Sequence, residues 1–344
     1  MRIAFINFKD FAYGGYLAFL SHLMPGLEKF GDTVEFFYIA TRPKKVYQRL
    51  KIKTRPIDKR KIPAVLNSFD LVINPSAKAE KSQAKYIPLL DYVTKPKMLV
   101  VHDPPELSTK GGLHYCLDKF NAFLFIRPAV LNWFLGKYFG KGFGLCEWLP
   151  HPYHRQNPNN EFGQMKRDLV VDLARIDWDK HQDVLLRAAK NIRAEVRIYS
   201  GFINPMYVYH KCKDLDWKSY YGGKFNNPMD VLKEAKIMVD LSAIQHDGGG
   251  TQYTFLEAMD AEAVPVVSEK WITDKAAMKD GQNCVVVQHN ENGVAVGIND
   301  LLADKERQAK IVENNYKLLE ERSWKSVIPK YQEYFRKVVE GGSK

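Results

Sequence analysis

Residues 167–201 of the chain read RDLVVDLARIDWDKHQDVLLRAAKNIRAEVRIYSG. The first apolar run is typical of a strand that is buried on both faces, and DVLLRAAKNI follows with helical spacing after a polar loop. A second strand-like run, AEVRIYSG, comes next. A strand, a helix and a second strand in this order predict a parallel β-α-β unit, the repeating element of a doubly wound α/β sheet.

The same alternation continues on both sides of this unit. Toward the C-terminus it runs through the helix MDVLKEAK, the strand IMVDLS, the helix TFLEAMDAE and the strand VPVVSE. Toward the N-terminus we expect the strands IAFINF, TVEFFYIA, DLVINP and KMLVV, with the helix LAFLSHLMPGLEKFG after the first of them. Residues 120–149 predict a strand, a short helix and another strand. The fold class is therefore α/β, and a long helix, SWKSVIPKYQEYFRKVVE, closes the chain.

The length of the chain also favours two domains. A chain of 344 residues exceeds what one hydrophobic core usually serves. The polar, proline-containing stretch WLPHPYHRQNPNNEFGQ separates the two series of strands and is the best candidate for a linker. We expect doubly wound domains at residues 1–163 and 164–322, followed by the closing helix at 323–344.

The composition, 45% hydrophobic and 26% charged, is that of an ordinary globular protein. The first residues, MRIAFINF, lack a secretory signal, and no apolar run reaches the roughly 18 residues that span a bilayer. We therefore expect a chain that folds from its first residue, in the cytoplasm. The four cysteines form no C-x-x-C pair and are expected as buried apolar residues, and His151 and His154 lack further ligands at metal-binding spacing.

The chain is basic, with 51 Lys and Arg against 40 Asp and Glu and a formal net charge of +11. Much of this charge lies between residues 42 and 61, where the one acid is Asp58. Such a run favours an anionic partner, although a solvated loop is the alternative interpretation. The residues expected to contact a polyanion are Lys44, Lys45, Arg49, Lys51, Lys53, Arg55, Lys59, Arg60 and Lys61.

Ligands of doubly wound sheets bind beyond the carboxyl ends of the strands, so the loops there hold the candidate site. In the first of these loops, Gly14 and Gly15 precede a helix and allow the backbone to approach a ligand closely. The pattern is not G-x-G-x-x-G, and the second strand lacks the acid that binds an NAD ribose. Because Arg42 at that place could suit NADP, a dehydrogenase is a weak alternative.

A second loop carries Arg175 and Lys180 between the first strand and the first helix of the second domain. Two cations at a strand's carboxyl end suit a diphosphate, because they neutralise its charge and the charge that develops on a leaving group. The alternative interpretation is a solvated surface pair.

A third loop contains three consecutive glycines before a helix, where backbone amides can contact phosphate oxygens. Glu257 lies within that helix in an apolar stretch, where a buried carboxylate needs a partner such as a ribose diol. An acid that interacts with the helix dipole is the alternative. The residues of this loop expected at the donor site are Asp247, Gly248, Gly249, Gly250 and Thr251.

A fourth candidate, His102-Asp103, directly follows the strand KMLVV of the first domain. Either side chain could contact a sugar or accept a proton from an acceptor. An Asx turn that ends the strand explains the pair equally well.

Taken together, these residues resemble the GT-B superfamily of glycosyltransferases, and glycosyltransferase family four in particular. The resemblance covers nearly the whole chain. ARIDWDKHQDVLLRAA looks like the family's R-x4-K diphosphate motif, GGGTQYTFLEAMDAEAVPVVSE like its donor signature, and YYGGKFNNPMDVLKEAKIMVDLS like the segment approaching the donor site. DGQNCVVV looks like its later loop, and SWKSVIPKYQEYF like the helix that crosses back to the first domain.

This resemblance implies two Rossmann-like domains that face each other across a cleft, the first for the acceptor and the second for a nucleotide diphosphate sugar. A UDP-sugar is the favoured donor. Arg175, Lys180 and the backbone of residues 249–251 would contact the diphosphate. Glu257 would bind the ribose, and His102 would contact the donor sugar region.

One position departs from the family pattern. The family has two glutamates eight positions apart, and the place of the first one, counted back from Glu257, holds Gly249. That glutamate normally binds the transferred sugar, so the sugar is left open, although Asp247 could reach in its stead.

A fainter resemblance is to phage DNA glucosyltransferases, which use an Asp just after the matching strand as the acceptor base. Asp103 fits that place and would deprotonate the acceptor in an inverting enzyme, whereas in a retaining enzyme His102 would mainly orient the sugar. DNA is favoured over a membrane as the acceptor, because the basic run is broken by prolines and lacks an amphipathic period. A duplex base would have to be flipped out to present a hydroxyl group, and the favoured one is that of a 5-hydroxymethylpyrimidine.

Two other functions are weighed against this one. A transferase for a polysaccharide or a lipid-linked acceptor would use the basic run and the aromatic stretch at 133–143 on an anionic membrane. A non-catalytic nucleotide-sugar or DNA-binding protein would explain why Gly249 stands where the family has a glutamate. The Asp-x-Asp pairs at 177 and 179 and at 214 and 216 could suggest a metal site, but the cations and helix N-termini already supply positive charge, so no required metal is expected.

Overall fold

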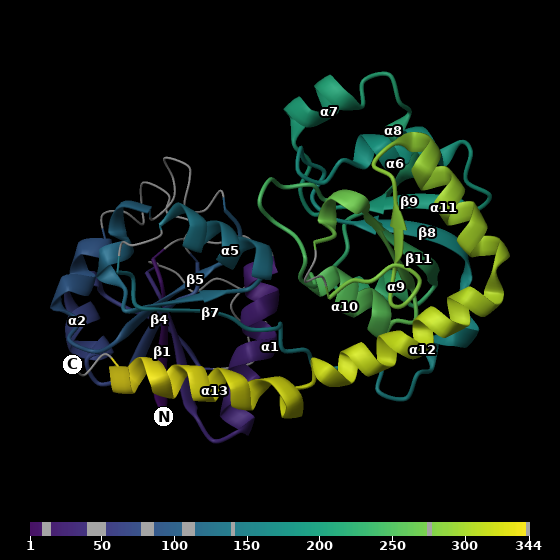
Figure 1. Cartoon of the computed structure of the whole chain (residues 1–344). Coiled ribbons are helices and arrows are strands. Elements are labelled where there is room, and N and C mark those ends of the chain that lie inside the picture. The colour runs from purple at the N-terminus through teal and green to yellow at the C-terminus, as the bar shows by residue number, and fades with distance from the viewer. Residues whose placement is uncertain are drawn as a thin grey trace. The chain divides into compact units, whose positions relative to one another are not determined.

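The computed structural model of the chain describes residues 1–8, 15–39, 53–76, 86–104, 114–138, 142–273 and 277–341. Its contacts divide the chain into unit 1, residues 1–154 and 322–344, and unit 2, residues 155–321. Figure 1 labels the elements of both units. Residues 155–163, assigned from the sequence to the first domain, lie in unit 2, where Arg155 binds the buried carboxylate of Asp260.

Unit 1 is built on a parallel sheet whose described strands follow the order β3-β2-β1-β4-β5-β6-β7. The order reverses direction beside β1, as in a doubly wound fold. The strands are β1 (Arg2–Asn7), β2 (Thr33–Tyr38), β3 (Thr54–Pro56), β4 (Leu71–Asn74), β5 (Lys97–Val101), β6 (Ala122–Phe125) and β7 (Leu145–Trp148).

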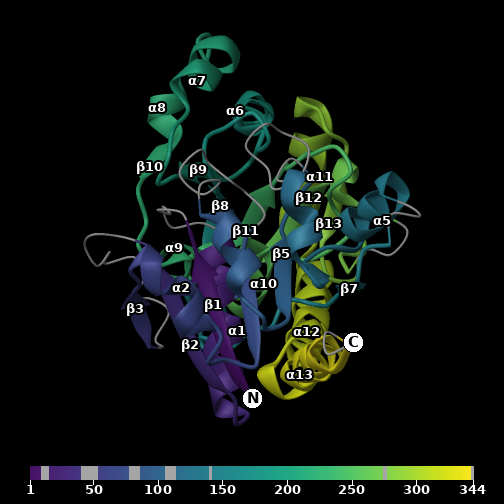
Figure 2. The ribbon, with the colours of Figure 1, turned by 90° about the vertical axis from the view of Figure 1, so that its left-hand side faces the viewer.

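Helices cover both faces of this sheet. The C-terminal helix α13 packs beside α1 on one face, as Figures 1 and 2 show. The two helices approach closely because residue 26 is a glycine: a Cβ there would lie 2.6 Å from Cδ1 of Ile328. The described helices are α1 (Gly15–Lys29), α2 (Ile62–Leu66), α5 (Pro128–Lys137) and α13 (Trp324–Gly341), with 3-10 turns at Lys59–Lys61, Ile87–Tyr92 and His114–Lys119.

Unit 2 repeats this plan with a parallel sheet of order β10-β9-β8-β11-β12-β13. Its strands are β8 (Arg167–Leu173), β9 (Glu195–Tyr199), β10 (Tyr221–Gly223), β11 (Ala235–Asp240), β12 (Val264–Ser268) and β13 (Val285–Val287). Its helices are α6 (Gln182–Ala189), α7 (Pro205–Lys211), α8 (Trp217–Tyr220), α9 (Pro228–Leu232), α10 (Tyr253–Asp260), α11 (Glu291–Ala303) and α12 (Lys305–Glu321), with a 3-10 turn at Glu269–Trp271.

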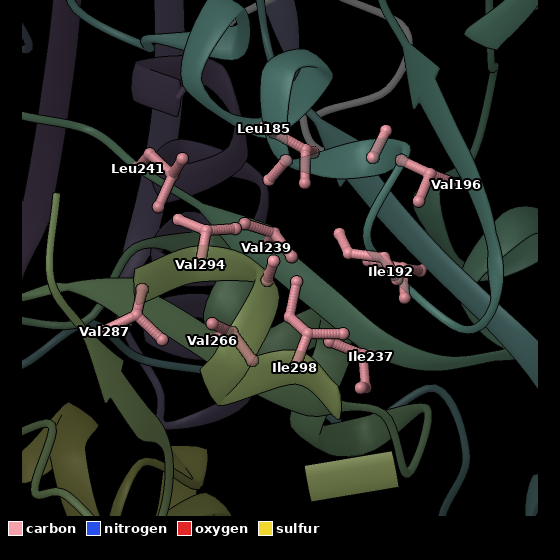
Figure 3. Packing of buried hydrophobic residues seen from close by; sticks show 14 of the residues in the cluster. Leu185, Ile192, Val196, Ile237, Val239, Leu241, Val266, Val287, Val294 and Ile298 are labelled. Carbon is pink, nitrogen blue, oxygen red and sulfur yellow. The ribbon is translucent and has the colours of Figure 1, made fainter. Parts of the chain in front are cut away.

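The core of unit 2 explains why its strands are apolar on both faces. Helices α6 and α11 contact each other on one face, and α10 contacts α9 and α12 on the other. Figure 3 shows Leu185 of α6 and Ile298 of α11 directed toward Val239 and Val266 of the sheet. Both layers bury aliphatic side chains, which is the dominant favourable contribution to folding of such a unit.

The strands and helices expected from the hydrophobic patterns are present, and both units are parallel α/β sheets as predicted. The described cysteines are free; Cys116, Cys212 and Cys284 are buried and Cys146 is half-buried. Within the described residues, no helix is both long enough and apolar enough to cross a membrane.

Candidate functional site

The carboxyl ends of β8 and β11 carry a polar cluster around Lys180. The Lys180 Nζ donates to Ser242 Oγ at 2.6 Å and to Gln252 Oε1 at 3.3 Å, and lies 3.7 Å from Asp240 Oδ2. Gln252 is the N-cap residue of α10. The ammonium group is therefore fixed at the N-terminal end of that helix, where the helix dipole also attracts anions.

Two buried carboxyl groups lie near this lysine on neighbouring strands. Burial, with the negative charge of Asp240 as a second cause, raises the pKa of Asp172 to about 8. Asp172 therefore carries its proton at neutral pH, which leaves Lys180 and Asp240 as the charged pair. Their charges cancel, so an anion that binds here meets no net negative charge from the cluster.

The loop between β8 and α6 is held in place by Gln182, which is fully buried. The Nε2 of Gln182 donates to the Arg175 carbonyl at 2.8 Å and to Asp172 Oδ1 at 3.4 Å, and its Oε1 accepts from the Asp177 N–H at 3.4 Å. These bonds tie the loop that carries Arg175 and Lys180 to the sheet.

Arg175 has partners that the sequence did not predict. Its guanidinium donates to Asp177 Oδ2 at 3.3 Å and to Asp179 Oδ2 at 3.0 Å, and the side chain is half exposed. The first Asp-x-Asp pair thus binds an arginine in this structure. A diphosphate that contacts Arg175 would compete with these carboxylates for its N–H groups.

The second Asp-x-Asp pair contributes a similar contact. Asp214 accepts two hydrogen bonds from the Arg187 guanidinium, at 2.8 and 3.1 Å.

The backbone of the glycine loop, which the sequence predicted to bind phosphate, makes hydrogen bonds within the protein. The Gly249 N–H donates to the Trp271 carbonyl at 2.9 Å, and the Gly248 N–H donates to Asp247 Oδ1 at 2.8 Å. Gly248 has φ +122°, and a Cβ there would lie 2.6 Å from the Trp271 carbonyl oxygen. Gly250 accepts from Trp271 Nε1 at 3.0 Å. The expected diphosphate contact through the Gly249 amide is therefore not available in this conformation, because that amide is already bonded.

Glu257 lies in α10, on the same helix whose N-cap contacts Lys180, and is 7% exposed. Burial raises the pKa of Glu257 to about 8, with the charge of Asp260 as a second cause. Within the described part of the chain its carboxyl group makes no hydrogen bond. An acid that is buried without a partner costs stability, as expected for a group that binds a ligand.

In unit 1, His102 follows β5 and is buried. Its Nε2 lies 2.8 Å from the Pro75 carbonyl, so this nitrogen carries the proton. The rings of Tyr16 and Phe19 meet the imidazole edge-on. Burial lowers the pKa of His102 to about 4, so the ring is neutral near pH 7. Asp103, the next residue, is half-buried.

The remaining predicted positions have different outcomes. Gly15 opens α1 and is exposed, with open space where a side chain would lie, whereas Gly14 is outside the described residues. Glu35 of β2 binds Lys53 at 2.9 Å and Arg55 at 3.3 Å, so these two cations are already paired within the protein.

Arg60 is paired with Asp58 at 3.0 Å. Lys59 and Lys61 are exposed. Lys44, Lys45, Arg49 and Lys51 lie outside the described residues. Thr251 is buried just before the N-cap of α10.

Sequence reasoning missed Asp172, Gln182, Asp240, Ser242 and Gln252. Asp172 and Asp240 were visible as polar residues at the carboxyl ends of apolar strands, in VVDL and MVDLS. A search for polar residues at strand ends finds both. Gln182 and Gln252 carry no comparable signal, because their roles depend on contacts between separate loops.

No protein-family model matches the sequence, and no curated protein sequence is similar to it. Solved structures of similar fold do exist. HepE of Anabaena in complex with UDP and glucose superposes with a TM-score of 0.77 at 13% identity, over 98% of this chain and 99% of HepE. The pneumococcal O-GlcNAc transferase GtfA in complex with UDP and GlcNAc gives 0.75 at 11% identity, over 98% and 99%.

An α-glucosyltransferase in complex with UDP and a 13-mer DNA containing an HMU base gives a TM-score of 0.76 at 13% identity, over 97% of this chain and 99% of that enzyme. At this level of identity the likeness shows the fold. The chain has the GT-B fold, with two Rossmann-like units, as the sequence resemblance implied.

Proposed function

We propose that the chain is a glycosyltransferase that transfers a sugar from a nucleotide diphosphate sugar, with a UDP-sugar favoured, to a hydroxyl group. One observation carries this proposal: a single helix, α10, has Lys180 bonded at its N-cap and the buried, unpartnered carboxyl group of Glu257 within it. A cation at a helix N-terminus suits a diphosphate, and a buried acid suits the hydroxyl groups of a ribose.

In this proposal unit 2 binds the donor. Lys180 and the N-terminal N–H groups of α10 would stabilise the diphosphate, most strongly when its bond to the sugar breaks and negative charge develops on it. Arg175 would join them once its carboxylate partners release it. The similar structures solved with UDP support this choice of donor.

Unit 1 would act on the acceptor. The acceptor oxygen bonds to the anomeric carbon, the bond from that carbon to the diphosphate oxygen breaks, and UDP departs with the electron pair. We assign the released acceptor proton to Asp103, because His102 is buried and its Nε2 already donates to the Pro75 carbonyl. His102 then orients the sugar as a neutral ring.

The favoured acceptor is a 5-hydroxymethylpyrimidine in DNA. The similar α-glucosyltransferase solved with HMU-containing DNA supports this choice, as does the net charge of +11. The exposed Lys59 and Lys61 can contact phosphates, whereas Lys53 and Arg55 are paired with Glu35 and contribute less than the sequence suggested. A reaction on DNA agrees with the cytoplasmic location expected from the sequence.

The test is a transfer assay with radiolabelled UDP-glucose and related UDP-sugars. The acceptors are duplex DNA with hydroxymethylated pyrimidines, the same duplex without them, and buffer alone. The proposal expects label on the hydroxymethylated duplex and slow release of free sugar in buffer. Release of sugar without transfer to DNA would keep the donor assignment and reject the DNA acceptor, and neither release nor transfer would reject the glycosyltransferase proposal.

A further inference from the structure

A group of large apolar side chains is exposed on unit 2 beside the donor loop. Trp178, Phe202, Met206 and Tyr209 are between 44% and 64% exposed. The ring of His210 joins this group, with its centroid 6.1 Å from that of Trp178 and 5.0 Å from that of Tyr209. We call Trp178, Phe202, Met206 and Tyr209 the exposed patch. An apolar cluster of this kind on a soluble surface marks an interaction site.

Hydrogen bonds fix the exposed patch to the loop that carries Arg175 and Lys180. The Ile176 N–H donates to the Phe202 carbonyl at 2.9 Å, and the Asn204 N–H donates to the Ile176 carbonyl at 2.9 Å. Asn204 also caps α7 and donates from Nδ2 to Asp177 Oδ1 at 2.9 Å. The patch and the donor loop are therefore one rigid surface of unit 2.

The helix α7 holds its apolar residues outward for a clear reason. Its inner face is already filled by Tyr207, which is fully buried and bonds through its hydroxyl to Asp183. Met206 and Tyr209 lie on the opposite, solvent side. In Figures 1 and 2 α7 stands out from the rest of unit 2, so a large ligand can reach it.

The segment that carries most of the exposed patch is basic. Residues 196–213 contain no Asp or Glu. Lys211 and Lys213 in this segment are exposed and make no ion pair within the described residues. Among the nearby acids, Asp177 and Asp179 share the single cation Arg175, Asp214 binds Arg187, and Asp183 accepts from the Tyr207 hydroxyl. The surface thus offers ring faces together with free cations.

We propose that the exposed patch binds unpaired bases and phosphates of the DNA acceptor strand, next to the base that is modified. This inference rests on the proposed function for its choice of DNA. Aromatic side chains stack on bases without regard to sequence, and lysines contact the phosphates between them. Flipping one base out of a duplex removes it from the stack and leaves its partner unpaired, so ring faces become accessible beside the modified base. A helix of seven residues is short for an anchor that lies in a membrane surface.

The experiment measures binding of a fluorescent single-stranded oligonucleotide, and of vesicles containing phosphatidylglycerol, to the full chain. The test variant is the double substitution Phe202→Ser with Tyr209→Ser, both at exposed positions. The control is Met165→Ser, which removes a similarly exposed side chain before the start of β8, at the opposite end of that strand. UDP-sugar hydrolysis is measured for each protein.

We expect the double variant to lose about tenfold in affinity for single-stranded DNA, with hydrolysis unchanged and the control close to wild type. Unchanged DNA affinity in the double variant overturns the inference. So does a loss of vesicle binding while DNA affinity is retained, which would identify a membrane surface. If the wild type hydrolyses no UDP-sugar but the double variant still loses DNA affinity, the proposed function fails and the DNA-binding surface stands.

Discussion

Equivalent strands of the two units end in the same kind of turn, but the side chain that accepts the hydrogen bond of the turn differs in charge. In unit 1 the turn follows β4, where the Ser76 N–H donates to Asn74 Oδ1 at 3.1 Å. In unit 2 it follows β11, where the Ser242 N–H donates to Asp240 Oδ1 at 2.8 Å. Both Asn74 and Asp240 are buried. A neutral amide in one unit is therefore replaced by a carboxylate in the other.

The central strands also differ in residue type, although Asp172 carries its proton at neutral pH. β1 ends in the buried amide of Asn7, whereas β8 carries the buried carboxyl group of Asp172 near its end. Around the neutral ends of unit 1 lies the neutral ring of His102, and around the charged ends of unit 2 lies Lys180. The central strand ends of unit 2 thus hold an ion pair, Lys180 with Asp240, where the matching strands of unit 1 end in the neutral amides of Asn7 and Asn74.

The largest expected effect tests the role of unit 1. Asp103→Asn removes the proton acceptor and should lower kcat by roughly 10²- to 10⁴-fold, while UDP affinity stays near that of wild type. Single-turnover transfer and UDP titration measure the two quantities. A mild effect of Asp103→Asn together with loss of activity in His102→Ala would reverse the roles of these residues and leave the proton to the departing diphosphate.

The next effect tests the charge of unit 2. Lys180→Ala should lower kcat/KM by roughly 10²- to 10³-fold, because the lost cation stabilises charge that is greatest in the transition state. Lys190→Ala, at an exposed position after α6, is the control and should leave kcat/KM unchanged. Activity of Lys180→Ala within about twofold of wild type, in a variant that keeps its Tm, contradicts the donor assignment.

A smaller effect separates ribose binding from phosphate binding. Glu257→Ala should weaken UDP roughly tenfold, because a buried hydrogen bond from the ribose to the carboxyl group is lost, while pyrophosphate affinity changes little. Glu257→Gln should weaken UDP less, since one acceptor oxygen remains. Calorimetric titration with both ligands measures this. Equal losses for UDP and pyrophosphate would assign Glu257 to the structure of α10.

The last effect concerns stability and pH. The pKa of Asp172 is raised to about 8 in the folded chain, so the folded state binds more protons than the unfolded state between about pH 4 and pH 8. The stabilisation is present below the ordinary pKa of an aspartate and is lost as the pH rises toward 8. Asp172→Asn makes the end of β8 resemble that of β1 and should reduce the fall in Tm between pH 5 and pH 8.

The expected difference in Tm is about ten degrees, since the linkage amounts to about 1.4 kcal/mol per pH unit and each kcal/mol shifts Tm by about 2–4 °C in a domain of this size. Thermal unfolding followed by circular dichroism at several pH values provides the measurement. A variant with the same pH dependence as wild type would show that Asp172 does not carry this proton.

The fold was predictable because it depends on local pattern. Apolar runs and helical spacing in stretches such as 167–201 specify strands and helices that pack on both faces. The short edge strand β3 was missed within the basic run, because its pairing with β2 and the contact of Lys53 with Glu35 join residues 18 positions apart.

The candidate site was only partly predictable, because some of its contacts join residues that are far apart in the sequence. Lys180 and Glu257 could be found because a cation at a strand end and an acid in an apolar helix are unusual locally. The sequence could not show that the Gly249 amide is already bonded, since its acceptor is the carbonyl of Trp271, 22 positions away. The pairing of Arg175 with Asp177 and Asp179 is local, and the alternating charges of RIDWDK were a signal for it.

Titration of UDP into the full chain tests the central claim most directly, because that claim assigns anion binding to the charged strand ends of unit 2. The account predicts that UDP binds the wild type and Asp103→Asn with similar affinity and raises the Tm of both, and that Lys180→Ala loses most of this affinity. Absence of UDP binding by the wild type, or binding that Lys180→Ala leaves unchanged, would contradict it.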